Sequence, residues 1–299
     1  MNIVGGIAPA VFAAALLAVP TATAATKATG PASGKLAADG AVAQIGQAID
    51  EQRYLDAAAE IDQAAIAGID DPRLTLLTGE LSLARARLND ALASFKAVDT
   101  KPTIGARALQ GEGITLSLLN RPAEAVEVLQ KAVAEDPKAW RAWNALGAEY
   151  DRRRAWSDAE AAYNRALGES QDTASVLNNR GYSRLLQNRL DEAMADFVTA
   201  LQKKPDLAAA RTNLRLAIAM KGEYGRAIEG ATPGDKAALL NNAGFAAILR
   251  GDYAQAEDLL AEAMKAKGEY YARASANLEM AEGMKSRDSN TAGRANAAH

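Results

Sequence analysis

The feature that most constrains this fold is a repeat of 34 residues in the middle of the chain. Alanines recur at that spacing, at Ala57, Ala91, Ala125, Ala159, Ala193 and Ala227. Glycines recur in step, each 12 residues before one of those alanines, at Gly79, Gly113, Gly147 and Gly181. Such a period is typical of a two-helix unit that cannot bury its apolar face alone and stacks on its neighbours. The pattern predicts an all-α solenoid in which these small residues mark where the two helices of each repeat cross.

Seven helix pairs follow from this spacing. The first is degenerate, with Ile45 in place of the glycine, and the sixth is five residues short because Gly230 and the run 231–234 cut its second helix to a turn or two. A capping helix is expected over 270–284, so the repeat domain covers 41–285 and holds about fifteen helices. The predicted repeats are 38–71, 72–105, 106–139, 140–173, 174–207, 208–236 and 237–270.

The two ends of the chain have a different character. Residues 1–24 have no charged side chain, and an apolar stretch is followed by the small-x-small pattern at 22–24, which predicts a cleaved signal peptide. The alternative is an uncleaved membrane anchor, because the stretch approaches the shortest length that spans a bilayer. Residues 25–40 are expected to form a flexible linker and 286–299 a disordered tail. The body of the protein is therefore expected in the periplasm or outside the cell.

Composition argues against several classes of function. The chain has no cysteine, which excludes disulfides, thiolate metal sites and a lipidated N-terminal cysteine, and its single histidine is His299. Histidine is the usual general base and metal ligand. The net charge of −3 does not indicate a basic surface that would bind nucleic acid. We expect no catalytic residue, cofactor, metal or small-molecule substrate, and membrane contact only through an uncleaved N-terminal segment.

Two short motifs invite a functional interpretation. Gly111-Glu112-Gly113 resembles the start of a dinucleotide-binding loop, but no strand precedes it, so packing glycines inside a helix are favoured. The run from Asp151 to Arg154 is basic, and it stands at the end of a first helix, where positive charge is favourable. A phosphate or nucleic-acid patch is the minor alternative for that run.

The fourth repeat has a set of apolar and small residues at fixed offsets, at Trp143, Leu146, Gly147, Tyr150, Ala159, Tyr163 and Ala166. With these residues it resembles the tetratricopeptide repeat, whose first helices line a concave face. The resemblance implies a scaffold that binds proteins or extended peptide segments. Asparagine is unfavourable inside helices, yet it recurs at two positions that would face this groove. The candidate groove residues are Asn144, Asn178, Asn179, Tyr182, Asn213, Asn241, Asn242 and Phe245.

These amides have two possible roles. An amide offers two donors and an acceptor, so a row of them could hold the backbone of an extended peptide. Alternatively, they satisfy polar groups between repeats or were inherited by duplication. Arg180, Arg211 and Arg215 occupy positions that are usually apolar or small in the family, so they need partners or a splayed stack. With the shortened sixth repeat, they predict a weaker seam over 208–236.

A narrower resemblance covers 174–284. The motif LNNRGY at 177–182 returns as LNNAGF at 240–245, and the whole segment resembles the TadD-type proteins of bacterial Flp/Tad pilus assembly. That resemblance implies an envelope component that supports secretin or pilus assembly through protein contacts. Members of the group are commonly outer-membrane lipoproteins, whereas this chain has no cysteine to carry a lipid. The alternative is a general periplasmic scaffold for cell-wall or outer-membrane assembly.

Overall fold

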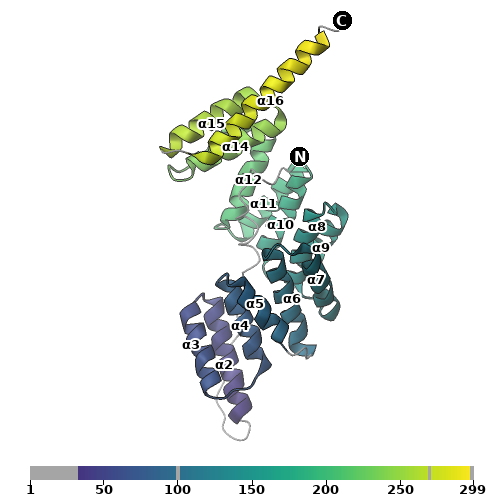
Figure 1. Cartoon of the computed structure of the whole chain (residues 1–299), viewed down its shortest axis with the longest axis vertical. Helices are drawn as coiled ribbons and strands as arrows, with labels where there is room; N and C mark the ends of the chain where they lie inside the picture. The colour runs from purple at the N-terminus through teal and green to yellow at the C-terminus, as the bar shows by residue number, and fades with distance from the viewer. Residues whose placement is uncertain (1–32, 99–101, 269–270, 297–299) are drawn as a thin grey trace. The chain divides into compact units, whose positions relative to one another are not determined.

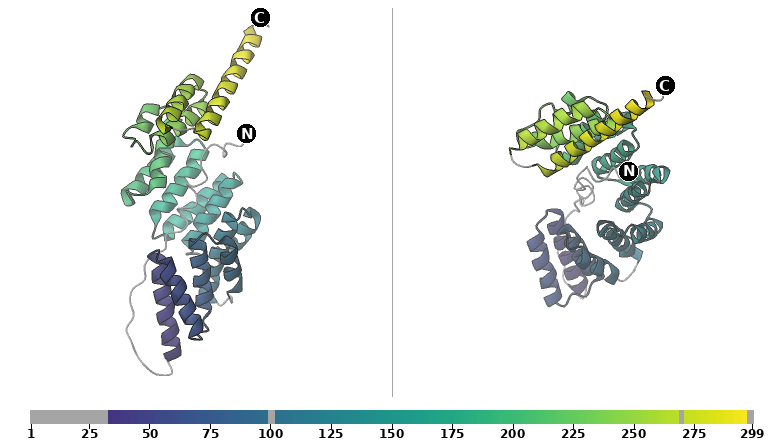
Figure 2. Two further views of the ribbon diagram at one scale, coloured as in Figure 1. Left: turned by 60° about the vertical axis from the view of Figure 1, so that its left-hand side comes forward. Right: turned by 45° about the horizontal axis from the view of Figure 1, so that its top comes forward.

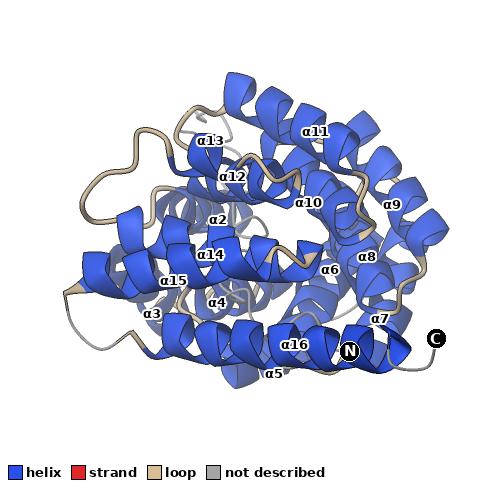
Figure 3. Ribbon diagram, turned by 90° about the horizontal axis from the view of Figure 1, so that it is seen from above, coloured by secondary structure: helices blue, strands red, loops and turns tan. Residues whose placement is uncertain are grey.

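The computed structural model describes residues 33–98, 102–268 and 271–296, and every regular element within these ranges is a helix (Figure 1, Figure 3). This confirms the predicted all-α solenoid of seven helix pairs and a final helix. The helices of these ranges are α2 (Ser33–Asp50), α3 (Tyr54–Ile66), α4 (Pro72–Ala84), α5 (Leu88–Ala97), α6 (Pro102–Leu118), α7 (Pro122–Glu135), α8 (Trp140–Arg152), α9 (Trp156–Glu169), α10 (Thr173–Leu186), α11 (Leu190–Lys203), α12 (Ala208–Met220), α13 (Tyr224–Ile228), α14 (Lys236–Arg250), α15 (Tyr253–Lys267) and α16 (Ala272–Asn296).

Close packing inside each pair depends on the repeated glycines. A Cβ added to Gly113 in α6 would lie 2.5 Å from Cγ of Leu129 in α7, and one added to Gly244 would lie 2.6 Å from Cγ of Leu260. Real Cβ atoms essentially never come so close, so only glycine lets the first helix touch the second. Gly111 faces the ring of Phe95 at 2.5 Å by the same measure. The glycines at 111 and 113 are therefore packing residues inside a helix.

The turn between the two helices of a repeat uses one residue with positive φ. Ala86 has φ of 56°, and the next residue, Arg87, donates its backbone N–H to the Ser82 carbonyl at 2.8 Å, which closes the first helix. The same conformation recurs every 34 residues and is adopted by Gln52, Ala86, Asn120, Arg154, Asn188 and Gly222. Five of these residues have a side chain, which strains the left-handed conformation.

We expect the substitution Ala86→Gly to raise the free energy of unfolding by about 0.5 to 1 kcal/mol, because glycine removes the strain of the left-handed turn. Ala93 supplies the matched control, since it lies exposed inside α5. Ala93→Gly should lower the same free energy by about 1 kcal/mol. Urea denaturation of the two variants checks both signs, and a loss of stability in Ala86→Gly would contradict the strain argument.

The chain divides into two compact units, and the boundary falls inside α10, between Ser183 and Arg184. The unit that contains α2 to α9 has cores built around side chains such as Ile45, Phe95 and Tyr163. In the unit that contains α11 to α16, Phe197, Leu240 and Leu260 are fully buried. Within each unit, consecutive helices lie side by side in each view (Figure 2). The boundary thus lies one repeat earlier than the seam predicted over 208–236.

Both predicted termini of the repeat domain need correction. The expected linker 25–40 is helical from Ser33, because Ala38 is buried and Asp39 pairs with Nη2 of Arg73 at 2.7 Å, which ties α2 to α4. The expected tail 286–299 continues α16 as far as Asn296, since no proline stops the helix after residue 285. The predicted signal peptide 1–24 and the residues 25–32 and 297–299 lie outside the described residues.

The sixth repeat has the short second helix that the sequence predicts, and its arginines find neutral partners. Arg215 donates to the carbonyl of Ala227 at 3.0 Å, and Arg211 donates to the carbonyl of Pro205 at 2.7 Å. In the other unit, Arg180 donates to Oδ1 of Asn164 at 2.7 Å. Carbonyl and amide oxygens thus accept from these side chains. Faster hydrogen exchange over 208–236 stays a prediction.

Candidate peptide-binding face and its polar clusters

All the candidate groove residues lie on first helices of their repeats. Helix α8 carries Asn144, α10 carries three of the residues, α12 carries Asn213, and α14 carries the remaining three. Tyr182 and Asn242 are partly exposed. The others are buried, and they are Asn144, Asn178, Asn179, Asn213, Asn241 and Phe245.

In the unit that ends at Ser183, three amides are joined. Nδ2 of Asn179 donates to Oδ1 of Asn144 at 3.1 Å, which links α10 to α8, the first helix of the preceding repeat. Nδ2 of Asn178 donates to Oδ1 of Asn179 at 3.2 Å. The amides therefore connect neighbouring repeats through their side chains.

The other unit contains a matching bridge. Nδ2 of Asn277 in α16 donates to Oδ1 of Asn241 at 3.0 Å, and Nδ2 of Asn241 lies 3.4 Å from Oδ1 of Asn242. Asn277 is not among the candidate residues predicted from the sequence. Its spacing could have identified it, because Asn277 follows Asn241 by 36 residues, much as Asn179 follows Asn144 by 35.

The bridges leave one amide donor unsatisfied. Nδ2 of Asn144 is buried and has no hydrogen-bond partner in the structure. A buried donor without a partner costs about 1 to 3 kcal/mol, so native proteins rarely keep one without a use. The structure thus brings Asn144, Asn178 and Asn179 together in one cluster and Asn241, Asn242 and Asn277 in another. Their role in peptide binding stays a prediction, and the partly exposed Asn242 is the feature that favours it.

A second polar cluster surrounds Asp151, which is the last acidic residue of α8. Its Oδ2 accepts from the hydroxyl of Tyr163 at 2.8 Å, and its Oδ1 accepts from the hydroxyl of Ser183 at 2.6 Å. All three residues are buried. Burial raises the pKa of Asp151 to about 6, and the two hydroxyl donors offset only part of that effect. In the sequence Asp151 belongs to a basic run, whereas in the structure its carboxylate accepts from hydroxyl groups and the arginines that follow bind elsewhere.

Those arginines reach back to the preceding repeat. Nη2 of Arg152 donates to Oδ1 of Asn120, and Nη2 of Arg153 donates to the carbonyl of Pro122 at 3.0 Å. Asn120 lies in the turn between α6 and α7, and Pro122 is the first residue of α7. These arginines therefore join neighbouring repeats, and fewer cationic groups of the run are available to bind a phosphate.

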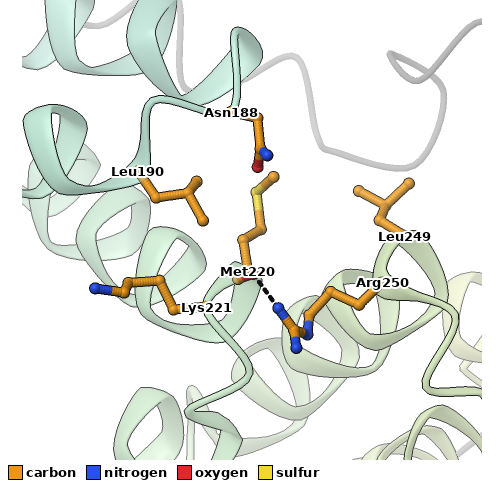
Figure 4. A pocket seen from close by; sticks show the side chains of 6 residues that line it. All are labelled: Asn188, Leu190, Met220, Lys221, Leu249 and Arg250. Atoms are coloured by element: carbon orange, nitrogen blue, oxygen red, sulfur yellow. Dashed lines mark hydrogen bonds between the residues drawn. The ribbon is translucent and has the colours of Figure 1, made fainter.

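In the other unit, the residues that correspond in the repeat to Asn120 and Arg152 border a hollow. Its volume is about 430 Å³, and Asn188, Leu190, Met220, Lys221, Leu249 and Arg250 line it (Figure 4). Lys221 pairs with Oδ1 of Asp191 at 2.6 Å, and Arg250 donates to the carbonyl of Met220 at 3.1 Å. The hollow thus combines apolar side chains with two cations at its rim.

The repeat register explains why this hollow is open. Adding 68 residues to Asn120, Pro122 and Arg152 gives Asn188, Leu190 and Met220. In the first unit a long arginine reaches the asparagine of the preceding turn. Methionine cannot donate such a bond, so the polar contact between turns is replaced by an apolar surface.

The described residues contain no group of three or more His, Cys, Asp or Glu side chains arranged to hold a metal ion. Within the same residues, none of the helices has both the length and the hydropathy that crossing a bilayer requires.

Comparison with known proteins identifies the repeat. Residues 112–172 and 145–208 each match the model of the tetratricopeptide repeat family. Protein FlbA of Caulobacter vibrioides is 31% identical over 117 residues, which is 37% of this chain and 20% of that protein. The chain therefore aligns with only about a fifth of the length of that relative.

Solved structures share the fold at low identity. The APC/C hetero-tetramer Cut9-Hcn1 gives a TM-score of 0.63 at 15% identity, covering 80% of this chain and 48% of that one. PilW, described as a widely conserved type IV pilus biogenesis factor, gives 0.52 at 19% identity, covering 81% and 98%. A tetratricopeptide repeat protein of Parabacteroides merdae gives 0.53 at 14% identity, covering 82% and 98%. Residues 112–208 thus match the tetratricopeptide repeat family, and the described helices form a fold shared with a solved tetratricopeptide repeat protein.

Proposed function

We propose that this protein is a non-catalytic adaptor that holds segments of partner proteins on the first-helix faces of its repeats. The observation that carries the proposal is that Tyr182 and Asn242 stay partly exposed on first helices, beside the buried amide clusters. A peptide carbonyl is a suitable acceptor for the amide of Asn242. Each such bond contributes a net ~1 kcal/mol, so it positions a peptide more than it holds one.

The hollow at 188–250 supplies a second contact surface for the same function. Apolar contact is the main source of affinity in protein interfaces, and a hollow of about 430 Å³ has room for a large apolar side chain. Leu249 is 36% exposed at its rim. Lys221 and Arg250 keep carboxylate partners, Asp191 and Asp252, so the rim has little net charge to select a partner. Shape and apolar contact are therefore the basis of recognition here.

We further propose that the protein works in the bacterial envelope and supports the assembly of an Flp/Tad pilus or a secretion system. The resemblance of 174–284 to TadD-type proteins, the partial match to FlbA and the shared fold with PilW support this assignment. The predicted signal peptide 1–24 supports a periplasmic or secreted location. The second candidate is a general periplasmic scaffold for cell-wall or outer-membrane assembly, favoured by the same signal peptide.

Deletion of the gene in its bacterial host separates the two candidates. We expect the deletion strain to lose surface pili or secreted substrate, and a plasmid copy of the wild type to restore them. Electron microscopy of pili and immunoblots of pilin and secretin measure this result. Normal piliation together with altered cell shape or detergent sensitivity would contradict the pilus assignment and favour the cell-wall scaffold.

Complementation with two variants tests the binding face. Asn178, Asn179, Asn241 and Asn242 are changed to alanine together, and Asn89→Ala is the matched control because Asn89 is an exposed asparagine on the second helix α5. We expect the first variant to fail and the control to succeed. Thermal melting of both purified proteins is required, since two of the four amides also bridge repeats. A variant that melts early and fails would show a structural role, and one that complements fully would contradict the proposed face.

A further inference from the structure

We propose that Asp151 is a proton-sensitive latch between repeats 4 and 5, which holds the repeats together more tightly when its carboxyl group is protonated. The latch joins three helices. Asp151 lies at the end of α8, Tyr163 belongs to α9 of the same repeat, and Ser183 belongs to α10 of the next repeat. The residues are 12 and 32 positions from Asp151 in sequence, so only the folded repeats bring them together.

The hydroxyl groups can serve both protonation states of Asp151. A hydroxyl donates one hydrogen bond and accepts others. When Asp151 is ionised, Tyr163 and Ser183 both donate to it, at 2.8 and 2.6 Å. When Asp151 is protonated, one of these hydroxyls rotates and accepts the proton of the acid. The geometry therefore tolerates the proton without moving a helix, whereas the ionised form has to keep a buried negative charge.

The charged groups around the latch do not neutralise it. From α9, Glu160 acts on Asp151 and raises its pKa further. From α8, Glu149 is 2% exposed and pairs with Arg152 at 3.6 Å. The pKa of Tyr163 is raised by burial, then by Asp151 and by Glu149. From α10, Tyr182 is uncharged near neutral pH, and its pKa is raised by burial and then by Asp151. The charges that raise the pKa of Asp151 and Tyr163 are thus carboxylates, and Arg152 of α8 pairs with Glu149.

The two arginines that directly follow Asp151 in sequence bind other acceptors. Arg152 and Arg153 reach the preceding repeat at Asn120 and Pro122. Two hydroxyl donors alone stabilise the carboxylate less than an arginine would, because charge-assisted pairs between ions are stronger. Ionisation of Asp151 therefore leaves a buried charge whose hydration is restored when α10 separates from α8.

The direction of the pH effect follows from this arrangement. In the unfolded chain Asp151 has a pKa near 3.9, and in the fold its pKa is about 6. The folded state then binds the proton more tightly, so the latch contributes its full stability below about pH 4 and loses it as the pH rises through 6. Between pH 4 and pH 7.5 the unfolding equilibrium constant should rise roughly fifty-fold through this residue alone.

The three tryptophans of the chain report on the latch directly, since Trp140, Trp143 and Trp156 all lie in α8 and α9. Urea denaturation of the full chain, followed by tryptophan fluorescence from pH 4 to pH 7.5, compares the wild type with Asp151→Asn. Asparagine has the shape of the protonated acid and cannot ionise. We expect the ratio of the two unfolding constants to change roughly fifty-fold over this range, with the wild type relatively less stable at the higher pH. A constant ratio would overturn the proposal.

Two further variants distinguish a latch from a merely structural contact. Ser183→Ala and Tyr163→Phe each remove one hydroxyl donor to the carboxylate, so each should move the midpoint of the pH dependence to a higher pH. A structural role alone would lower stability equally at every pH. Should Asp151→Asn fail to fold, the displaced midpoint of Ser183→Ala still supports the latch, and an unmoved midpoint refutes it.

Discussion

Replacing Gly147 with alanine should lower the free energy of unfolding by about 2 kcal/mol, although alanine is the better helix former. The added Cβ would lie 2.6 Å from Cε1 and 2.8 Å from Cζ of Tyr163. That ring is fully buried, and its hydroxyl donates to Asp151, so it cannot swing aside without breaking a buried hydrogen bond. The helices α8 and α9 must separate instead, which loosens the contact throughout the fourth repeat.

Gly168→Ala is the matched control for this substitution. Gly168 lies in α9, and nothing stands within 4 Å of the Cβ that alanine would add. Here the helix gains propensity without a clash, so stability should rise by about 0.5 kcal/mol. Urea denaturation followed by tryptophan fluorescence measures both proteins. Equal stability of the two variants would show that the helices adjust freely, and that the glycine period does not reflect close packing.

Removing Arg184 should destabilise the unit that begins with it by about 3 kcal/mol. Nη1 of Arg184 lies 2.8 Å from Oδ2 of Asp196, and the two side chains are 13% and 6% exposed. Arg184→Met keeps much of the apolar stem and removes the charge, so the carboxylate of Asp196 loses this cation while it stays buried. The double variant Arg184→Met, Asp196→Leu removes both charges and should recover most of the loss, because an apolar pair can replace a buried ion pair.

Arg189 provides the exposed counterpart of this pair. Nη2 of Arg189 lies 2.6 Å from Oε2 of Glu192, but the side chains are 36% and 51% exposed. Exposed ion pairs contribute little, so Arg189→Met should change stability by less than about 0.5 kcal/mol. Far-UV circular dichroism in urea is the suitable measurement, because no tryptophan lies in this unit. A double variant no more stable than Arg184→Met would contradict the ion-pair explanation.

The repeat period alone was sufficient to predict the helix pairs and their packing residues. Glycine at 113, 147 and 244 recurs because a Cβ there would strike the second helix, and the same requirement applies to each of these repeats. A packing requirement that recurs from repeat to repeat produces a period in the sequence. The ends of the domain were predicted less well. Helix α2 begins at Ser33 and α16 continues to Asn296. The small and polar residues at both ends have the composition of a linker, but packing at α2 and the absence of proline in α16 allow each helix to extend through them.

The sequence by itself determined the fold class, the order of the helices and the first-helix positions of the candidate groove residues. Only the tertiary structure decided what those residues touch. Asn144 meets Asn179 across a repeat boundary, Asp151 meets Ser183 beside the division between the units, and Asn241 meets Asn277. Such contacts depend on rotamer, burial and the spacing of neighbouring helices, and each occurs once or twice. A period cannot record a contact that does not repeat, which is why the amide bridges and the latch appear only in the folded chain.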